Sequence, residues 1–170
     1  NDFKFTVNGA VGTSSRLGHS ASIYYPEKTE VGSSTKTVSF ETTWTFNQLL
    51  SYTKNFGNHH VDVLLGHESY DYEYNYLKGS MQNQTIHNGN FEFSNYSVPD
   101  EQDSYTNTYK TEGFLARANY DYNSRYFLSA SVRRDGSSRF YKDSRWGTFF
   151  SVGAGWRIDE ERFMEDLDFI

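Results

Sequence analysis

The 170-residue sequence contains no cysteine, only two prolines and no long apolar run. The lack of cysteine excludes a disulfide scaffold, a thiolate metal site and a cysteine nucleophile. No stretch approaches the roughly 20 apolar residues of a membrane helix, and no basic start followed by an apolar stretch indicates a signal peptide. Only helical spans are excluded in this way, because a membrane β-barrel carries its lipid-facing side chains at alternate positions.

Basic residues are also in the minority, with 16 Lys and Arg against 22 Asp and Glu and a formal net charge of -6. This balance disfavours nucleic-acid binding, which needs at least a local basic stripe. Aromatic residues are plentiful instead, since 14 Tyr, 14 Phe and 3 Trp make up 18% of the chain. Aromatic side chains favour strands, and the straight-chain helix formers that a helical bundle needs are few. The composition therefore predicts an all-β fold.

Six segments alternate apolar and polar side chains with the two-residue period of a β-strand. In one of them Leu128, Ala130 and Val132 share an apolar face, which we expect to point outward to lipid, while Ser129 and Ser131 share a polar face. The acidic run that starts at residue 159 suits the first turn of a short helix, and residues 168–170 are expected to begin another strand. The predicted strands cover residues 3–11, 40–53, 61–76, 111–122, 126–135 and 147–158.

The connections between these strands alternate in length. We expect long loops near residues 12–36 and 78–108, short turns at 55–59 and 122–125, and a medium connection at 135–146. In an antiparallel meander this order gathers all long loops at one end, which is typical of outer-membrane barrels with short periplasmic turns and long outer loops. The predicted fold is all-β: an antiparallel meander of about six strands that forms an arc of a large transmembrane β-barrel.

A ladder of alternate tyrosines, Tyr70, Tyr72, Tyr74 and Tyr76, continues the third predicted strand. Its parity is opposite to that of the apolar face that begins at Val61. Either a bulge in the strand switches the face, or the ladder points inward; the sequence leaves both open. The four tyrosines are candidate substrate-binding residues, because a sugar or peptide can stack on aromatic faces. The alternative is an aromatic girdle at the membrane interface, which needs no ligand.

No other cluster predicts a catalytic residue, a metal ligand or a cofactor. The adjacent His59 and His60 project in different directions, so they do not give two ligands on one strand face. Asp100, Glu101 and Asp103 fall in a predicted polar loop, and carboxylate catalysis needs a held separation that such a loop does not give. No general base stands beside the serines that follow the Asp-Gly pair at 135–136.

Sequence motifs between Asn119 and Met164 are more specific. The stretch NYDYNSRYFLSASVRRDGSSRF, followed by RWGTFFSVGAGWRIDEERFM, resembles the barrel of the SusC/RagA family of TonB-dependent outer-membrane transporters. Upstream, NQLLSYTKNFGNHHVDVLLGHE is similar to an earlier hairpin of these barrels. The match is good over residues 37–77 and 111–165, with Phe150 in place of an expected proline. The motif residues, for which the resemblance implies a structural role, are Arg133, Asp135, Gly136, Ser137, Ser138, Trp146, Gly155 and Trp156.

The resemblance implies an outer-membrane transporter of a Gram-negative bacterium that imports large nutrients, glycans or peptides. It also implies a SusD-like surface lipoprotein over the outer loops, and energy from the TonB system acting on a plug domain. Such barrels have about 22 strands, so we expect residues 1–170 to form one part of a barrel, without the plug. Transport needs binding and gating rather than catalysis. The alternative is a soluble β-sandwich that binds carbohydrate, which the loop lengths and the outward apolar faces disfavour.

Overall fold

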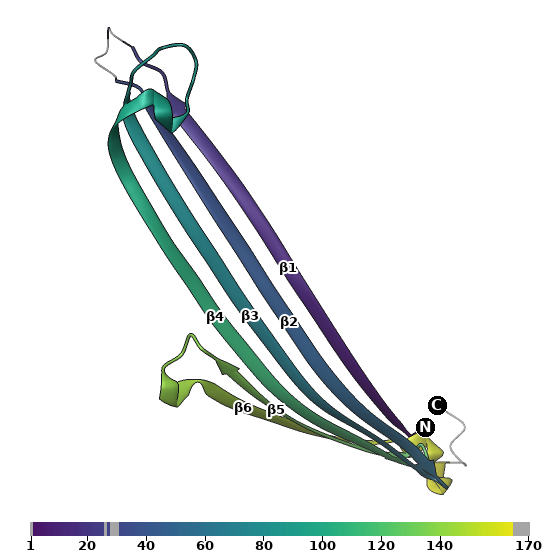
Figure 1. The fold of residues 1–170 in the computed structure, drawn as a ribbon. Helices are drawn as coiled ribbons and strands as arrows, with labels where there is room; N and C mark the ends of the chain where they lie inside the picture. Colours follow the sequence, from purple (N-terminus) through teal and green to yellow (C-terminus); the bar gives the residue numbers. More distant parts are fainter. Residues whose placement is uncertain (1, 26, 28–30, 165–170) are drawn as a thin grey trace. The chain divides into compact units, whose positions relative to one another are not determined.

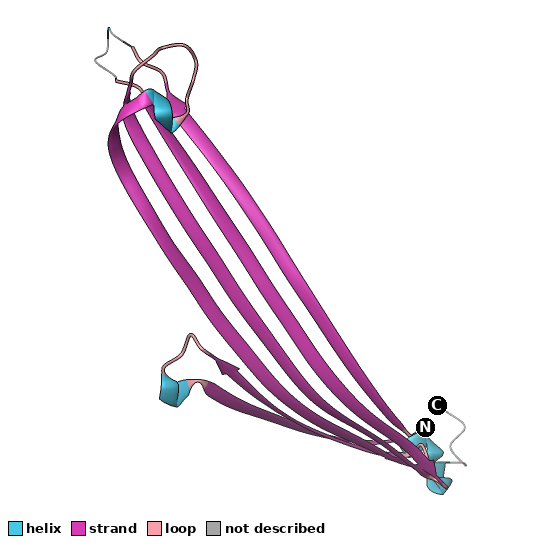
Figure 2. Cartoon of the chain, viewed as in Figure 1, coloured by secondary structure: helices cyan, strands magenta, loops and turns pink. Residues whose placement is uncertain are grey.

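The computed structural model describes residues 2–25, 27 and 31–164, and its six strands form one sheet in chain order (Figure 1). Short 3-10 helices lie in the connections and after the last strand (Figure 2). The predicted all-β antiparallel meander of six strands is therefore confirmed. The strands are β1 Phe3–Ser22, β2 Ser33–Phe56, β3 His59–Gln84, β4 Tyr96–Tyr122, β5 Tyr126–Ser137 and β6 Trp146–Trp156, and the helices are η2 Phe93–Asn95, η3 Lys142–Ser144, η4 Ile158–Glu160 and η5 Arg162–Met164.

No helix in the described part of the chain is both long enough and apolar enough to cross a membrane.

The strands reach further than the sequence predicts. β1 and β2 take up most of the loop predicted at 12–36, and β3 and β4 take up most of the one at 78–108. These stretches carry polar residues on both faces, so they show no apolar period, yet their backbones still pair. Hydroxyl pairs join the strands there, such as Ser22 with Ser33 at 2.9 Å and Thr35 with Ser80 at 3.0 Å. The connections that remain are 23–32, 57–58, 85–95, 123–125 and 138–145.

The two short turns lie where the sequence predicts them. Gly57 has a φ of 61°, a conformation that glycine adopts without the steric cost of a Cβ. In the other turn Asn123 and Ser124 have φ angles of 57° and 53°. The Asp121 carboxylate accepts a hydrogen bond from the Ser124 backbone N–H at 2.7 Å. This bond within the turn gives the Ser124 N–H a partner and stabilises the left-handed conformation. The alternation of short and longer connections is thus retained, with shorter outer connections than expected.

The six strands belong to two compact units. The first contains residues 1–10, 44–71 and 109–170, and so includes all of β5 and β6 with parts of β1 to β4. The second contains residues 11–43 and 72–108, which carry the rest of β1 to β4 and the connections 23–32 and 85–95.

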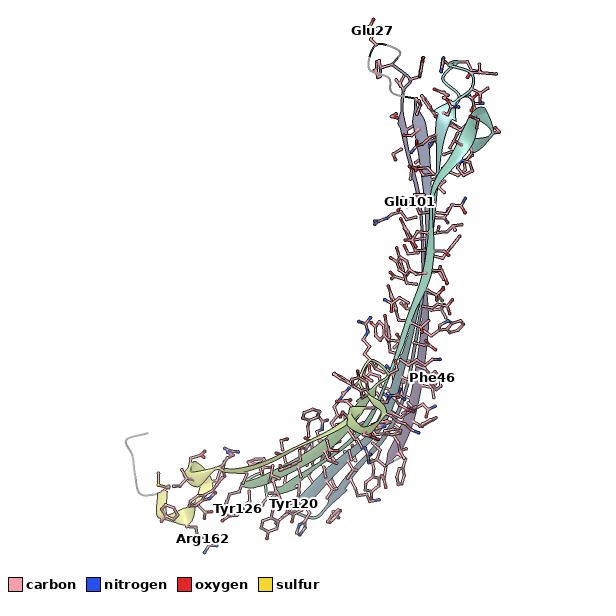
Figure 3. All side chains as sticks on the ribbon, turned by 90° about the vertical axis from the view of Figure 1, so that its left-hand side faces the viewer. Glu27, Phe46, Glu101, Tyr120, Tyr126 and Arg162 are labelled. Carbon is pink, nitrogen blue, oxygen red and sulfur yellow. The ribbon has the colours of Figure 1, made fainter. Side chains whose placement is uncertain are left out.

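The first unit presents an apolar and a polar face. The register sets Ala130 of β5 opposite Ala118 of β4 and Val152 of β6, so apolar residues meet across three strands. One residue further on, Ser131 lies opposite Arg117 and Ser151. Side chains project from both faces of the sheet (Figure 3). The predicted parity of β5 is confirmed.

No second layer covers the apolar face. In the described residues Tyr96 is the only buried hydrophobic side chain, and it lies in the second unit. On the apolar face of the first unit, Phe150 is 83% exposed, Val152 75% and Leu128 51%. A β-sandwich buries the inner faces of two packed sheets, so this exposure argues against the soluble sandwich.

The connection 85–95 of the second unit is held by hydrogen bonds. The Asn95 amide donates to the carbonyl oxygens of Ile86 at 2.7 Å and Asn90 at 2.8 Å. The Ser34 hydroxyl, which is fully buried, donates to the carbonyl oxygen of Phe91 at 2.7 Å. This connection therefore has a defined conformation, because buried polar groups at its base bond its backbone.

Candidate functional site

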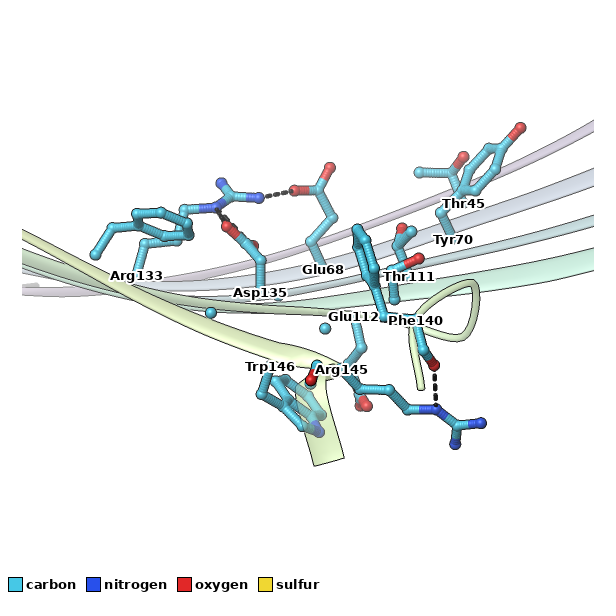
Figure 4. A pocket seen from close by; sticks show the side chains of 16 residues that line it. Thr45, Glu68, Tyr70, Thr111, Glu112, Arg133, Asp135, Phe140, Arg145 and Trp146 are labelled. Atoms are coloured by element: carbon cyan, nitrogen blue, oxygen red, sulfur yellow. Dashed lines mark hydrogen bonds and ion pairs between the residues drawn. The ribbon is translucent and has the colours of Figure 1, made fainter. Parts of the chain in front are cut away.

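The first unit contains an open recess of about 700 Å³ that is lined by side chains from both sides of the sheet (Figure 4). A charged cluster of Glu68, Arg133 and Asp135 lies in it, from β3 and β5. The Arg133 Nε donates to both carboxylate oxygens of Asp135, at 2.8 and 2.9 Å, and its Nη2 donates to Glu68 at 3.4 Å. These pairs connect β3 with β5 across β4.

Gly113 of β4 makes room for this bridge. A Cβ at position 113 would lie 2.7 Å from the Asp135 carboxylate and 3.2 Å from Arg133 Nη2. The described bonds of the cluster are these ion pairs, which hold Arg133 between two carboxylates.

Two other motif residues pack on the opposite side of β5 and β6. A Cβ at Gly136 would come within 2.9 Å of the Trp146 ring, so glycine lets the indole lie flat against the strand. The Arg134 guanidinium carbon lies 5.2 Å from the centre of the same ring. Consecutive arginines thus serve different faces: Arg133 bonds carboxylates on the polar face, and Arg134 stacks on an indole on the apolar face.

The motif serines bond to backbone groups. Ser138 N–H donates to the Lys110 carbonyl oxygen at 2.9 Å, and the Ser138 hydroxyl accepts from the Lys110 N–H at 2.8 Å. Ser137 N–H donates to the Arg145 carbonyl oxygen at 3.0 Å. The Ser137 hydroxyl accepts from the Arg139 N–H at 3.3 Å, so both serine hydroxyls bond backbone groups at the end of β5.

Glu161, which the sequence analysis treated only as part of an acidic helix start, joins several groups at the other end of β5 and β6. It accepts hydrogen bonds from the Tyr126 hydroxyl, from Trp156 Nε1 at 3.1 Å and from Arg125 Nη1 at 3.1 Å. Trp156 also stacks on Tyr126, with ring centres 6.5 Å apart. The acidic run does contribute to a single 3-10 turn, η4. No sequence pattern signals the Glu161 contacts, because two of the three partners, Arg125 and Tyr126, are more than 30 residues away along the chain.

These contacts hold the pKa of Glu161 below its ordinary value of 4.5, through the Tyr126 hydrogen bond first, then the Trp156 hydrogen bond and the Arg125 charge. A lowered folded-state pKa stabilises the segment above the unfolded value, and that stabilisation is lost as the pH falls through the folded pKa. We predict that Glu161→Gln speeds amide hydrogen exchange in residues 157–164 at neutral pH. The effect should shrink only at acid pH, as the pH falls through the lowered folded pKa and wild-type Glu161 also becomes protonated.

Glu160→Gln is the matched control, because the one side-chain bond of Glu160 among the described residues is to Arg157, at 2.7 Å. It should leave amide exchange in residues 161–164 at the wild-type rate. Equal protection in Glu161→Gln and wild type at neutral pH would show that the Glu161 contacts do not hold this segment.

Tyr70, the first residue of the tyrosine ladder, lies on the polar face of the first unit. It follows Glu68, which bonds Arg133 on that face, by two residues of β3, and its ring lies 5.7 Å from that of Tyr109. For Tyr70 the structure therefore supports the inward alternative.

In the second unit the remaining ladder residues meet partners from neighbouring strands. The Tyr72 hydroxyl donates to Glu41 at 3.3 Å. The rings of Tyr74 and Tyr76 lie 5.9 and 5.1 Å from the ring of Tyr105 on β4. Within the second unit, Tyr72, Tyr74 and Tyr76 thus contact side chains of the strands on either side of β3.

The acidic group at 100–103 requires a correction. Asp100, Glu101 and Asp103 lie on β4 and not in a loop, because the polar strands extend further than their hydropathy indicates. Glu101 pairs with Lys78 of β3 at 2.5 Å, which is the bond of a cross-strand pair. Among the described residues no group of three or more His, Cys, Asp or Glu is arranged to hold a metal ion.

Comparisons with known proteins give consistent matches. No family model matches the chain. Over 63 residues, 37% of this chain, it is 49% identical to TonB-dependent receptor P39 of Formosa agariphila. Over 127 residues, 72% of this chain, it is 32% identical to TonB-dependent receptor SusC of Bacteroides thetaiotaomicron. The matched segments span only 6% and 12% of these relatives, respectively.

Solved structures show the same fold. The RagAB peptide transporter matches with a TM-score of 0.86 at 20% identity, over 97% of this chain and 19% of that chain. The open-open state of the RagAB peptide importer matches with a TM-score of 0.84 at 20% identity, over 96% of this chain and 19% of that chain.

Proposed function

Because the chain belongs to the SusC/RagA family of TonB-dependent receptors, we propose that its six strands are neighbouring strands in the wall of an outer-membrane transporter barrel. The observation that carries this proposal is the sheet with one exposed apolar face, one polar face and no covering layer. Such a sheet is stable when lipid covers the apolar face and the rest of a closed barrel pairs its edges.

The dimensions of β6 support the same placement. Trp146 and Trp156 begin and end this strand of 11 residues. At a rise of about 3.3 Å per residue and a tilt of about 45°, ten steps give a height of roughly 23 Å. Barrels carry an apolar band about 25 Å tall between two aromatic girdles, and the two tryptophans match those girdles.

The transporter would import large nutrients, glycans or peptides, through its polar side. The tyrosine ladder then faces the lumen, where it offers stacking surfaces to sugar rings or peptide side chains, beside the Glu68–Arg133–Asp135 cluster. This task is binding and gating, and it requires no catalytic residue or cofactor. The proposed transporter also has a plug domain, which is driven by the TonB system. A SusD-like surface lipoprotein lies over connections 23–32 and 85–95. The transporter is located in the outer membrane of a Gram-negative bacterium.

Cysteine labelling of neighbouring positions on β5 tests the membrane placement. In the full-length protein embedded in its membrane, we expect a water-soluble thiol reagent to label Ser131→Cys and to leave Ala130→Cys unlabelled. Position 131 faces the polar side opposite Ser151, whereas position 130 lies between Ala118 and Val152.

Detergent-unfolded protein provides the control, since both cysteines should then react equally. Equal labelling of the two cysteines in the intact membrane would contradict the placement and favour the soluble carbohydrate-binding module.

A further inference from the structure

The two consecutive arginines of β5 differ in how their charges are satisfied. Arg133 bonds two carboxylates on the polar face. Arg134 lies on the apolar face, opposite Phe114 of β4 and Thr148 of β6, and is exposed. Within the described part of the chain its guanidinium has no ion pair, and its only described interaction is the stacking on Trp146. Arg134, which follows Val132 on the apolar face by two residues, therefore has no ion-pair partner among the residues that the structure describes.

The position of Arg134 on β5 indicates the level of the membrane at which its guanidinium lies. Trp146 marks the end of the apolar band that runs along β6 to Trp156, and in lipid such a tryptophan sits at the headgroup level. Arg134 lies over its ring, so the guanidinium is held at that same level. This inference rests on the proposed barrel, in which the longer connections face the outside of the cell.

Arg145 brings a second cation to this side of the sheet. It lies on the same side as Trp146, away from Arg133 (Figure 4). Its Nε donates to the Phe140 carbonyl oxygen at 3.1 Å, which fixes the side chain and leaves the terminal nitrogens with no described partner. Arg145 thus adds a second positive charge on the side of the sheet where Arg134 stacks on Trp146, and these charges favour an anion.

Two other pairs of charged groups described on this face of the first unit bond each other. Glu112 and His67 bond each other at 3.1 Å, and the His67 ring stacks on Phe114 with centres 4.8 Å apart. Lys110 pairs with Asp71. Glu112 of β4 lies opposite Gly136, two residues beyond Arg134 along β5, and its described bond is to His67.

We propose that Arg134, held by Trp146 and assisted by Arg145, binds the phosphate group of an anionic lipid in the outer leaflet. A guanidinium matches phosphate oxygens in a two-pronged geometry, and stacking on an indole orients it at little entropic cost. A lipid phosphate is the anion that reaches this level of the membrane with its acyl chains along Val132, Phe150 and Val152, which are exposed on the apolar face.

The test compares Arg134→Gln with Arg133→Gln in the full-length transporter. Each protein is purified and placed in neutral phosphatidylcholine vesicles with or without added lipid A, whose glucosamine phosphates supply the anion. We expect lipid A to raise the melting temperature of the wild type and of Arg133→Gln. Arg134→Gln should bind lipid A about fivefold more weakly, the loss typical of one basic side chain at a membrane surface. Arg145→Gln should show a smaller loss in the same direction.

Three outcomes decide the proposal. A full lipid A response in Arg134→Gln overturns it. An equal response to inorganic phosphate in neutral vesicles also overturns it, because the anion would then be a free ion and not a lipid. Heat-modifiable mobility of the inserted protein separates this failure from that of the proposed function: loss of insertion in the wild type contradicts the barrel itself, whereas normal insertion with an unchanged lipid response in Arg134→Gln contradicts only the lipid site.

Discussion

Replacing Ala130 with arginine is expected to destabilise the membrane-embedded barrel by about 2–4 kcal/mol, the cost of a basic side chain at mid-membrane depth on the lipid face of a barrel strand. Ala130 lies opposite Val152, close to the middle of the strand between Trp146 and Trp156. The guanidinium of an arginine at position 130 could not reach the headgroups of either leaflet without distorting the strand. Urea titration of the protein in phospholipid vesicles, followed by heat-modifiable gel mobility, measures the loss.

Ser129→Arg is the matched control for this prediction. Ser129 is the preceding residue of β5 and lies on the polar face, opposite Asn119 and Gly153. Asn119 donates to the Asp62 carboxylate at 3.3 Å, so an acidic group lies near the new arginine. The control should keep near wild-type stability. Equal destabilisation by both substitutions would mean that lipid does not cover the Ala130 face.

The faces of the apolar strands could be predicted from the sequence because side-chain direction on a strand follows a strict period of two. In β5, Leu128, Ala130 and Val132 therefore fell on the correct side without knowledge of any neighbour. The parity of the tyrosine ladder was equally visible, but its direction depended on whether β3 contains a bulge, a backbone property that residues such as Gly66 permit without requiring.

Strand length was predicted less well for a physical reason. Hydropathy detects a strand only when its two faces meet different surroundings. Outside the apolar band both faces of β3 and β4 are polar, so stretches such as Lys78–Gln84 resemble a loop although their backbones pair. The contacts within the candidate site could not be predicted from the sequence for a related reason. The Arg133–Glu68 pair joins residues 65 positions apart, and only the register brings them together.

The connection 85–95 is expected to matter for partner binding and uptake more than for folding. The structure narrows the segment to change, since β3 continues to Gln84 and β4 begins at Tyr96. Thr85 N–H donates to the Asn95 carbonyl oxygen at 2.8 Å, so the chain ends at the base of the connection are already adjacent. Replacing residues 86–94 with an Asn-Gly turn should therefore close the hairpin without strain.

We predict normal insertion of this shortened protein in the outer membrane, with at least about tenfold weaker binding of the surface lipoprotein, equivalent to about 1.4 kcal/mol. The reason is that Ile86, which is 58% exposed, and the backbone around Phe91 are presented in one fixed conformation by Ser34 and Asn95. A preorganised surface binds without the cost of ordering a loop. Co-purification of the lipoprotein and growth on the cognate polymer measure the two effects.

Glu92→Gln is the control that removes the Glu92–Lys36 ion pair but keeps the connection 85–95. Glu92 pairs with Lys36 of β2, and the hydrogen bond and charge of Lys36 lower the pKa of this carboxylate. The variant keeps the full length of the connection and its other hydrogen bonds, so it should bind the lipoprotein nearly as the wild type does. A shortened protein with full partner affinity and full uptake would leave the connection without a transport role. The connection 85–95 would then only join β3 to β4. The role of the long polar extensions of these two strands would need a different explanation.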